Sequence, residues 1–297
     1  MEESIRCSIY DVNNGLDILP NTLYKYYKPN KKFNKKRLSG EIFFSCPNNF
    51  NDVFDAQHEI INNIESVENT PTIYNKLNEI GYSDPLDIIE KLKGVEKDKY
   101  KIEVRNKQIE NVGITCFTNN PLSVLMWAYY AENTGYCIEY DICEIRNNIE
   151  KLVETELQER EKATTKRILA NAVSYTHTLP CAPLFFQKGI KDQPLSKYFY
   201  KSKCWEHENE YRIVLSLLPN AVLKFDRAVK SITFGYNIEI GIAHSMLKHI
   251  ITSKLNIDIY FLKKIKGNDG FEREKFPFVN KNEVKNLRKN ILLFKNL

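Results

Sequence analysis

Short apolar and aromatic runs alternate along the chain with segments of helical periodicity, and together they predict a mixture of strands and helices. Runs rich in β-branched and aromatic residues, bounded by Pro, Asn or Gly, are typical of strands. Such runs predict strands at residues 22–27, 40–45, 112–118, 136–141, 171–175, about 208–215, 221–225, 231–234 and 257–262.

Apolar residues spaced three and four positions apart predict the helices. Residues 69–111 should form two or three amphipathic helices, and residues 122–132, 144–167, 194–203 and 238–254 should form others. Asn119, Asn120 and Pro121 provide N-cap and first-turn residues for the helix at 122–132, and Gly135 should end it. The prolines at 180–183 favour a turn.

No internal repeat, low-complexity tract or linker divides the 297 residues, and this length suits one large domain. We therefore predict a single α+β domain over residues 1–297 with a mixed or antiparallel β core. The core should span about 20–265, with a helical insertion at 58–111 and a lysine-rich C-terminal tail at 266–297.

Composition excludes several classes of protein. Hydrophobic residues make up 42% of the chain, which excludes general disorder, and no apolar run is long enough for a membrane span. The seven cysteines never occur as C-x-x-C, so neither a disulfide framework nor a zinc ribbon is indicated. Residues 1–6 lack the pattern of a signal peptide. We expect a cytoplasmic protein with no membrane partner.

Net charge and sequence motifs exclude few classes of binding partner or cofactor. The net charge of +5 allows nucleic acid as a partner without implying it, and the basic run at 28–37 is either solvated or a nucleic-acid contact. No G-x-G-x-x-G, G-x-x-x-x-G-K-[ST], H-E-x-x-H or G-x-S-x-G occurs, and the histidines are scattered. We expect no metal site.

The segment from Trp205 to Arg212 has the highest density of reactive groups. On a strand beginning near Glu208, the side chains of Glu208, Glu210 and Arg212 would share one face. One interpretation is a catalytic carboxylate oriented by Arg212, which stabilises an oxocarbenium-like centre or activates a nucleophile. The other is a solvated strand face with an ordinary ion pair.

Two further segments are candidates for ligand binding. Trp127 and Tyr130 lie on the predicted helix at 122–132 and either line a pocket that stacks a flat ring or belong to the core. Asn51 and Asp52 either hydrogen-bond a ribose or, with Asp55, hold a metal ion, unless they only cap their own loop.

Taken together, these segments resemble a bacterial family known as domain of unknown function 2971. The resemblance rests on a Leu-Tyr-Lys-Tyr strand, a Gly-led apolar strand with an Asn-Asp loop, a Cys-Phe-Thr strand, a Met-Trp helix and a Trp-x-x-Glu-x-Glu-x-Arg segment. These motifs occur in order between about residues 20 and 240, at 23–26, 40–55, 116–118, 126–141 and 205–212.

The layout of that family is in turn similar to the ADP-ribosyltransferase fold, in the branch related to DNA-modifying toxins. The resemblance implies NAD as the substrate, with Tyr24 and Lys25 on its phosphate or ribose and Ser45 beside the nicotinamide ribose. It implies Glu210 as the catalytic glutamate, with Glu208 two residues earlier. Lys25 stands where those enzymes usually have His or Arg. A toxin or phage-defence effector with a nucleic-acid or protein acceptor would follow.

Three hypotheses for function remain open from the sequence. The first is an ADP-ribosyltransferase or NAD glycohydrolase. The second is a metal-dependent nuclease or other phosphoryl-acting enzyme, built on Asp52, Asp55, Glu208 and Glu210. The third is a non-catalytic sensor that binds a nucleotide in an aromatic pocket around Trp127 and Trp205. The oligomeric state is left open.

Overall fold

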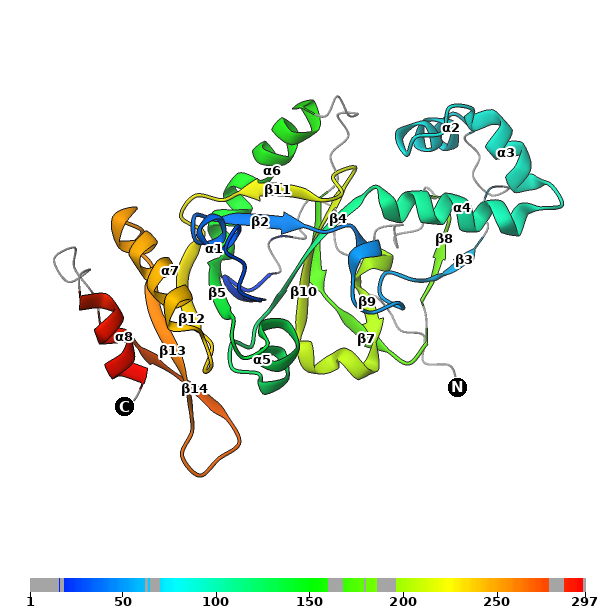
Figure 1. Ribbon diagram of the computed structural model, residues 1–297. Coiled ribbons are helices and arrows are strands. Elements are labelled where there is room, and N and C mark those ends of the chain that lie inside the picture. The colour runs from blue at the N-terminus through cyan, green and yellow to red at the C-terminus, as the bar shows by residue number, and fades with distance from the viewer. Residues whose placement is uncertain are drawn as a thin grey trace.

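A mixed eight-stranded sheet with helices on both faces forms the centre of the molecule (Figure 1). The computed structural model describes residues 16, 19–61, 64, 70–159, 168–178, 180–185, 196–277 and 286–295. The strand order is β14-β13-β12-β5-β1-β4-β10-β6; β12 and β13 run parallel, and the other neighbours are antiparallel. The strands are β1 (Thr22–Tyr27), β4 (Val112–Thr118), β5 (Tyr136–Asp141), β6 (Ile168–Ala172), β10 (Glu210–Ser216), β12 (Val229–Phe234), β13 (Asp258–Lys264) and β14 (Phe271–Lys275). The predicted α+β class is confirmed.

One face of this sheet carries the largest apolar core. Because side chains alternate along a strand, Ile138 of β5 and Ile213 of β10 point to this face. It is covered by helices α6 (Ile142–Glu159) and α7 (Ile240–Thr252) and by a two-stranded sheet of β2 (Glu41–Phe44) and β11 (Ala221–Lys224). We call it the core face and the opposite one the site face. Residues 160–167, predicted as the end of α6, lie outside the described residues.

Helix α5 (Val124–Ala131) covers part of the site face. The N-cap residue is Ser123, whose hydroxyl accepts from Met126 N at 3.3 Å, so the predicted start at Asn119 to Pro121 is wrong. Those residues form a turn instead, because the Asn120 side chain accepts from Leu122 N at 2.9 Å. The helix ends at Glu132 in the left-handed region, φ 51°.

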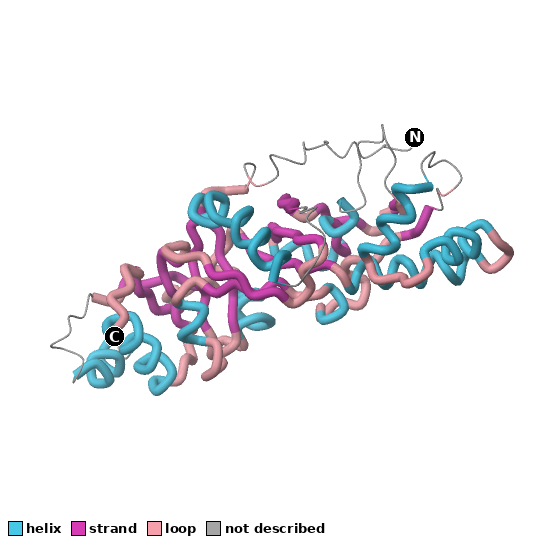
Figure 2. Tube along the Cα trace, turned by 90° about the horizontal axis from the view of Figure 1, so that it is seen from above, coloured by secondary structure: helices cyan, strands magenta, loops and turns pink. Residues whose placement is uncertain are grey.

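Three amphipathic helices form one end of the elongated molecule, as Figure 2 shows from above. They are α2 (Thr70–Glu79), α3 (Pro85–Lys93) and α4 (Lys97–Glu110), and they pack around a small core of their own that includes Leu184 and Phe185. Residues 181–183 are not the predicted turn: β8 (Cys181–Pro183) pairs with β3 (Glu59–Ile61).

Two other predictions about the second half of the chain are wrong. The predicted helix at 194–203 is, in its described part, a 3-10 helix η2 (Ser196–Phe199) and a strand β9 (Tyr200–Ser202), which pairs with β7 (Ser174–Thr176). The 3-10 helix η3 (Lys203–Glu208) follows. The predicted tail contains β14 and α8 (Leu287–Lys295), which buries Leu287 and Ile291 in the main core.

Short elements α1 (Asn34–Leu38) and η1 (Pro47–Asn49) complete the described fold. None of the helices in its described parts could span a bilayer.

A buried lysine joins η2 to the helical end of the molecule. Lys197 Nζ donates to Gln108 Oε1 at 2.9 Å and lies 3.4 Å from His58 Nε2. Burial lowers the pKa of Lys197 from 10.5 to about 7, and burial with the nearby Lys197 charge lowers the pKa of His58 to about 3. The lysine therefore loses its proton on folding above neutral pH.

This lysine predicts a pH dependence of stability. Between pH 7 and 10.5 the unfolded chain holds the Lys197 proton and the folded chain does not, so stability should rise with pH by at most about 1.4 kcal/mol per unit. Lys197→Met should remove this contribution and flatten the curve. Denaturant unfolding of both proteins across that range measures it, with Lys93→Met as an exposed control; equal slopes for wild type and Lys197→Met would contradict it.

Candidate functional site

The sheet brings the first strand and the late strand together at one end of β4. Thr118, the last residue of β4, pairs with Tyr24 of β1 on one side and with Glu210 of β10 on the other. Residues that pair directly in antiparallel strands point to the same face. Tyr24 and Glu210 therefore both lie on the site face, one strand apart, although 186 positions separate them in the sequence.

Five charged side chains form a buried group on this face, which we call the carboxylate cluster: Asp55, Lys201, Glu208, Glu210 and Arg212. Arg212 is 0% exposed and binds Asp55 through both terminal nitrogens, at 2.8 and 2.7 Å. Its Nε donates to Glu210 Oε1 at 2.6 Å, and its Nη1 donates to the Tyr198 carbonyl at 2.7 Å. Such two-pronged carboxylate contacts fix the guanidinium in one orientation.

Lys201 supplies the second cation of the cluster. Its Nζ donates to Glu208 Oε2 and, at 3.1 Å, to Glu210 Oε2, and it lies 3.6 Å from Asp55 Oδ2. Three carboxylates and two cations leave one negative charge in excess. The other oxygen of Glu208 accepts from the Tyr130 hydroxyl, so the half-buried Tyr130 connects the cluster to the surface.

The chain reaches this arrangement through a tight turn before β10. Asn209 is left-handed, with φ 45°, and separates η3 from the strand. Glu208 therefore comes from η3, so the predicted shared strand face holds for Glu210 and Arg212 only. The alternative of a solvated face is wrong because Glu208 and Glu210 are 2% and 5% exposed. Tyr175 fixes the turn by accepting from Glu210 N at 2.8 Å.

The surroundings shift the pKa values of Glu208 and Glu210 in opposite directions. Burial raises the pKa of Glu208 to about 6; Lys201 opposes this shift and the charge of Glu210 adds to it. Burial also disfavours the charged form of Glu210, but Arg212 and Lys201 outweigh it and hold its pKa well below the ordinary value. Paired carboxylates with pKa values pushed apart are the usual basis for separate acid and base roles.

Lys25 lies on the opposite face of the sheet from the carboxylate cluster. It follows Tyr24 on β1, so its side chain points to the core face, where Nζ donates to Thr115 Oγ1 at 3.1 Å and to the Cys116 carbonyl at 2.7 Å. Burial lowers its pKa. The sequence left open whether Lys25 and Glu210 share a site, and the strand register places their side chains on opposite faces of the sheet.

Ser45 is also removed from the cluster. Its backbone pairs with Ile114, four residues before Thr118 on β4, which places it about 13 Å along the strand from the Glu210 pairing position. Its hydroxyl donates to the Cys46 carbonyl at 3.1 Å. This position does not fit the predicted place beside a ribose held at Glu210.

Trp127 belongs to the core instead of a ligand-lining wall. It is 0% exposed, packs edge-on against Tyr26 with ring centroids 5.1 Å apart, and donates its indole N–H to the Pro121 carbonyl at 2.9 Å. A side chain with no exposed ring face cannot stack a ligand. Tyr24 packs against the same small cluster, with its ring 5.7 Å from the Arg273 guanidinium carbon.

The predicted loop at 51–55 reaches the site through both of its ends. Asp55 is the partner of Arg212, and the Asn51 side chain hydrogen-bonds the Tyr130 hydroxyl. Asp52 caps the loop by accepting from Phe54 N at 3.0 Å, and its other carboxylate oxygen is buried with no hydrogen-bond partner among the described residues.

Comparison with known families supports the prediction made from the motifs. Residues 126–213 match the model of a family described as a protein of unknown function, DUF2971. The match supports the resemblance to that family over this region of the chain. No curated protein and no solved structure matched the chain. The DUF2971 region runs from α5 into β10 and contains every member of the carboxylate cluster except Asp55.

The DUF2971 region also holds functional candidates that the sequence analysis missed. Lys201 lay in a predicted helix, and no motif marked it or Tyr175. Three rings gather beside the cluster, with centroids 6.0 to 6.5 Å apart: Tyr129, His207 and Trp205, of which Trp205 was already predicted to line an aromatic pocket. Lys201 Nζ lies 5.1 Å from the Trp205 ring centre, and Tyr129 is 57% exposed. Their spacing along α5 and η3 gave no signal that they would meet.

Three of the four carboxylates of the metal-dependent hypothesis, Asp55, Glu208 and Glu210, do converge, but upon Lys201 and Arg212. Within the ranges that the structure describes, no group of three or more His, Cys, Asp or Glu side chains is arranged to hold a metal ion. Both cations already satisfy the carboxylate oxygens that such an ion would use.

Proposed function

We propose that the chain is an NAD-consuming enzyme of the ADP-ribosyltransferase or NAD glycohydrolase type, with Glu208 and Glu210 as its reacting carboxylates. The observation that carries the proposal is this buried pair, held by Lys201 and Arg212, with pKa values shifted in opposite directions. Glu210 lies on the same face as Tyr24, with β4 between their strands, and this supports the proposal because the resemblance implies that the first and late strands both contribute to one site.

The proposed reaction needs Glu210 to stay ionised and Glu208 to accept a proton. When the bond between ribose and nicotinamide breaks, its electron pair leaves with the nicotinamide and positive charge develops on the ribose. An ionised Glu210 stabilises that charge more in the transition state than in the ground state. The oxygen of water or of an acceptor then bonds the ribose carbon, and its proton passes to Glu208, whose pKa of about 6 suits a general base.

The rings beside the cluster support a flat substrate. Tyr129, Trp205 and His207 surround the surface next to Lys201 and Tyr130, and aromatic side chains bind planar rings by stacking. We assign to them the ring contact that the sequence had suggested for Trp127.

In biological terms we propose a toxin or phage-defence effector that acts by consuming NAD. The acceptor would be water, nucleic acid or protein. The cluster supplies the acid–base groups for all three, because each offers an oxygen or nitrogen nucleophile that must lose a proton.

Nicotinamide release by the purified protein tests this function. NAD is supplied with and without DNA, RNA or cell extract, and wild type is compared with Glu210→Gln. The matched control is Glu206→Gln, because Glu206 lies on η3 but is exposed and pairs with Lys203 at 2.5 Å. We expect release by wild type and control and a loss of about 100-fold or more in Glu210→Gln. Binding of NAD without release of nicotinamide would favour the sensor hypothesis. A wild-type protein that does not bind NAD and releases no nicotinamide would contradict the proposal.

A further inference from the structure

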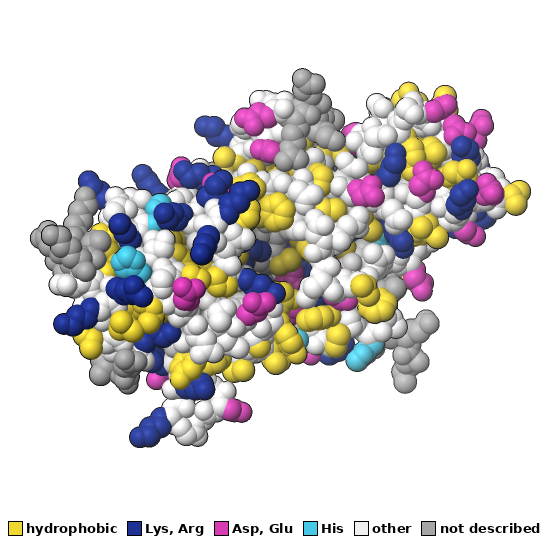
Figure 3. All heavy atoms as spheres, in the orientation of Figure 1, with side chains coloured by type: hydrophobic (Ala, Val, Ile, Leu, Met, Phe, Trp, Pro, Cys, Tyr) yellow, Lys and Arg dark blue, Asp and Glu magenta, His cyan; other side chains and the backbone are white. Residues whose placement is uncertain are grey.

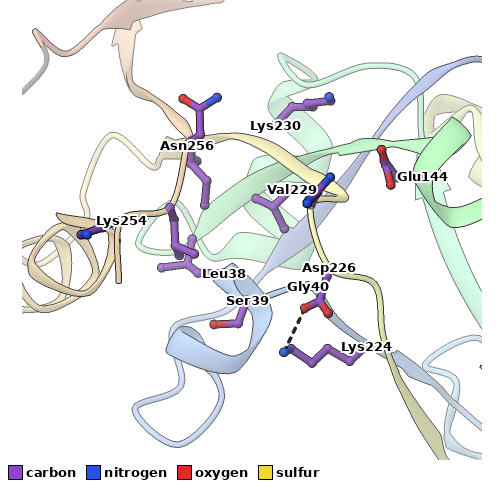
Figure 4. Close-up of a pocket in the computed structure, with 13 residues that line it drawn as sticks. Leu38, Ser39, Gly40, Glu144, Lys224, Asp226, Val229, Lys230, Lys254 and Asn256 are labelled. Atoms are coloured by element: carbon purple, nitrogen blue, oxygen red, sulfur yellow. Dashed lines mark ion pairs between the residues drawn. The ribbon is translucent and has the colours of Figure 1, made fainter. Parts of the chain in front are cut away.

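A pocket lies on the core-face side of the molecule, away from the carboxylate cluster. Its volume is about 580 Å³, within the range of small-molecule sites. Four separate segments line it: the end of α1 with Ser39 and Gly40, the start of α6, residues 224–230 of β11 and β12, and residues 254–257 between α7 and β13 (Figure 4). It shares no residue with the cluster.

The rim of this pocket carries four basic side chains and two acidic ones, Glu144 and Asp226. Arg227 and Lys254 are exposed, and the described residues provide neither side chain with an ion-pair partner. Lys224 and Lys230 also line it, and each has one acidic partner, Asp226 at 2.9 Å and Asp141 at 2.8 Å. Figure 3 shows basic side chains gathered over α1, β11 and α7, on the same part of the molecule.

The backbone at the two unpaired cations is unusual. Arg227 and Lys254 are left-handed, with φ 69° and 52°. Each closes a turn: Leu255 N donates to the Ile250 carbonyl at 3.0 Å at the end of α7, and Ala228 N donates to the Phe225 carbonyl at 3.2 Å around Arg227. Both residues end a turn that leads directly into the pocket wall.

The floor of the pocket is apolar. Leu38 and Val229 are buried in the main core, and Leu255 and Ile257 are partly buried against it. The Ser39 hydroxyl and the exposed Asn256 side chain add polar groups at the edge. Polar groups around an apolar floor are typical of sites that bind an organic molecule in one orientation.

We propose that this pocket binds a small organic phosphate, with the phosphate on Arg227 and Lys254 and the organic part on Leu38, Val229 and Leu255. Two unpaired cations favour a dianionic group, and guanidinium matches the geometry of phosphate oxygens. The apolar floor favours an organic part over inorganic phosphate alone. The two sites have no residue in common, so binding here can be measured without NAD and does not rest on the proposed function.

Methyl NMR of the full chain tests the proposal, with the methyl groups of Leu38, Val229, Leu255 and Ile257 as local probes. The ligands are AMP, ADP and glucose 6-phosphate, each compared with adenosine or glucose and with inorganic phosphate. We expect at least one organic phosphate to shift these methyl signals with a Kd of about 1 mM or tighter, while adenosine and glucose do not. The methyls of Ile88 and Leu92 on α3 should not move.

Paired variants separate a specific site from general charge. Arg227→Gln/Lys254→Gln should weaken binding about tenfold or more, and Lys93→Gln/Lys97→Gln, which removes the same charge from α3 and α4, should leave it unchanged. Asn256→Trp keeps every charge and should also block binding by filling the pocket. Equal weakening in both double variants, or no shift of the pocket methyls by any organic phosphate, would overturn the proposal. RNA binding without those shifts would assign the basic face to nucleic acid and overturn it too.

Discussion

Replacing Arg212 with methionine is expected to lower the free energy of unfolding by about 3–5 kcal/mol, the largest stability effect that we predict for a single residue. The guanidinium is fully buried and bonds both Asp55 and Glu210. Without it, two buried carboxylates keep only Lys201 as a cationic partner. Denaturant unfolding at neutral pH measures the change.

Two companion variants make this prediction specific. Arg288→Met removes an exposed arginine of α8 and should change stability by no more than about 0.5 kcal/mol. The double variant Arg212→Met/Asp55→Leu should recover part of the loss, because removing both partners leaves fewer unpaired buried charges. A loss below about 1 kcal/mol in Arg212→Met would show that the cluster does not hold the fold together.

Glu208→Gln is expected to lower kcat/KM for nicotinamide release by about 100-fold or more while the fold is retained. The amide oxygen can accept from Lys201, and the amide nitrogen can donate to Tyr130, whose hydroxyl also accepts. Glutamine resembles the protonated acid, which burial already favours at Glu208. It cannot take up the proton of the nucleophile.

The same variant has a distinct pH signature. As a base, Glu208 must be ionised, so wild-type activity should rise with pH through about 6, and this limb should be absent from any residual activity of Glu208→Gln. The stability of wild type relative to the variant should fall as the pH rises from 4.5 to 6, because the folded chain holds the proton more tightly in that range. Identical pH profiles of activity would contradict the role of Glu208 as a base.

Local patterns predicted much of the fold because its strands are short and clearly bounded. The limits of β1, β4 and β5 follow from apolar runs closed by turn residues, and the three helices of the insertion follow from their spacing. The prediction of a helix at 194–203 was wrong because the conformation of this segment depends on the pairing of β9 with β7, a long-range contact. The predicted start of α5 was wrong because Ser123, and neither of the two preceding asparagines, is the N-cap residue.

The candidate site was predictable only in part. Alternation along a strand placed Glu210 and Arg212 on one face and puts Tyr24 and Lys25 on opposite faces, but only the register of β1 against β4 shows which of these two shares the face of Glu210. That register depends on tertiary structure. Lys201 meets Glu208 and Glu210 only because β9 and η3 turn back upon β10, so no spacing in the sequence could have indicated it.

The measurement that tests the account most directly is the rate of nicotinamide release from NAD by wild type, Glu208→Gln and Glu206→Gln, prepared together and shown to be folded by their unfolding curves. We expect similar rates for wild type and Glu206→Gln, and a rate for Glu208→Gln that is lower by about 100-fold or more. Equal rates in all three proteins, or no release by folded wild type with any acceptor, would contradict it.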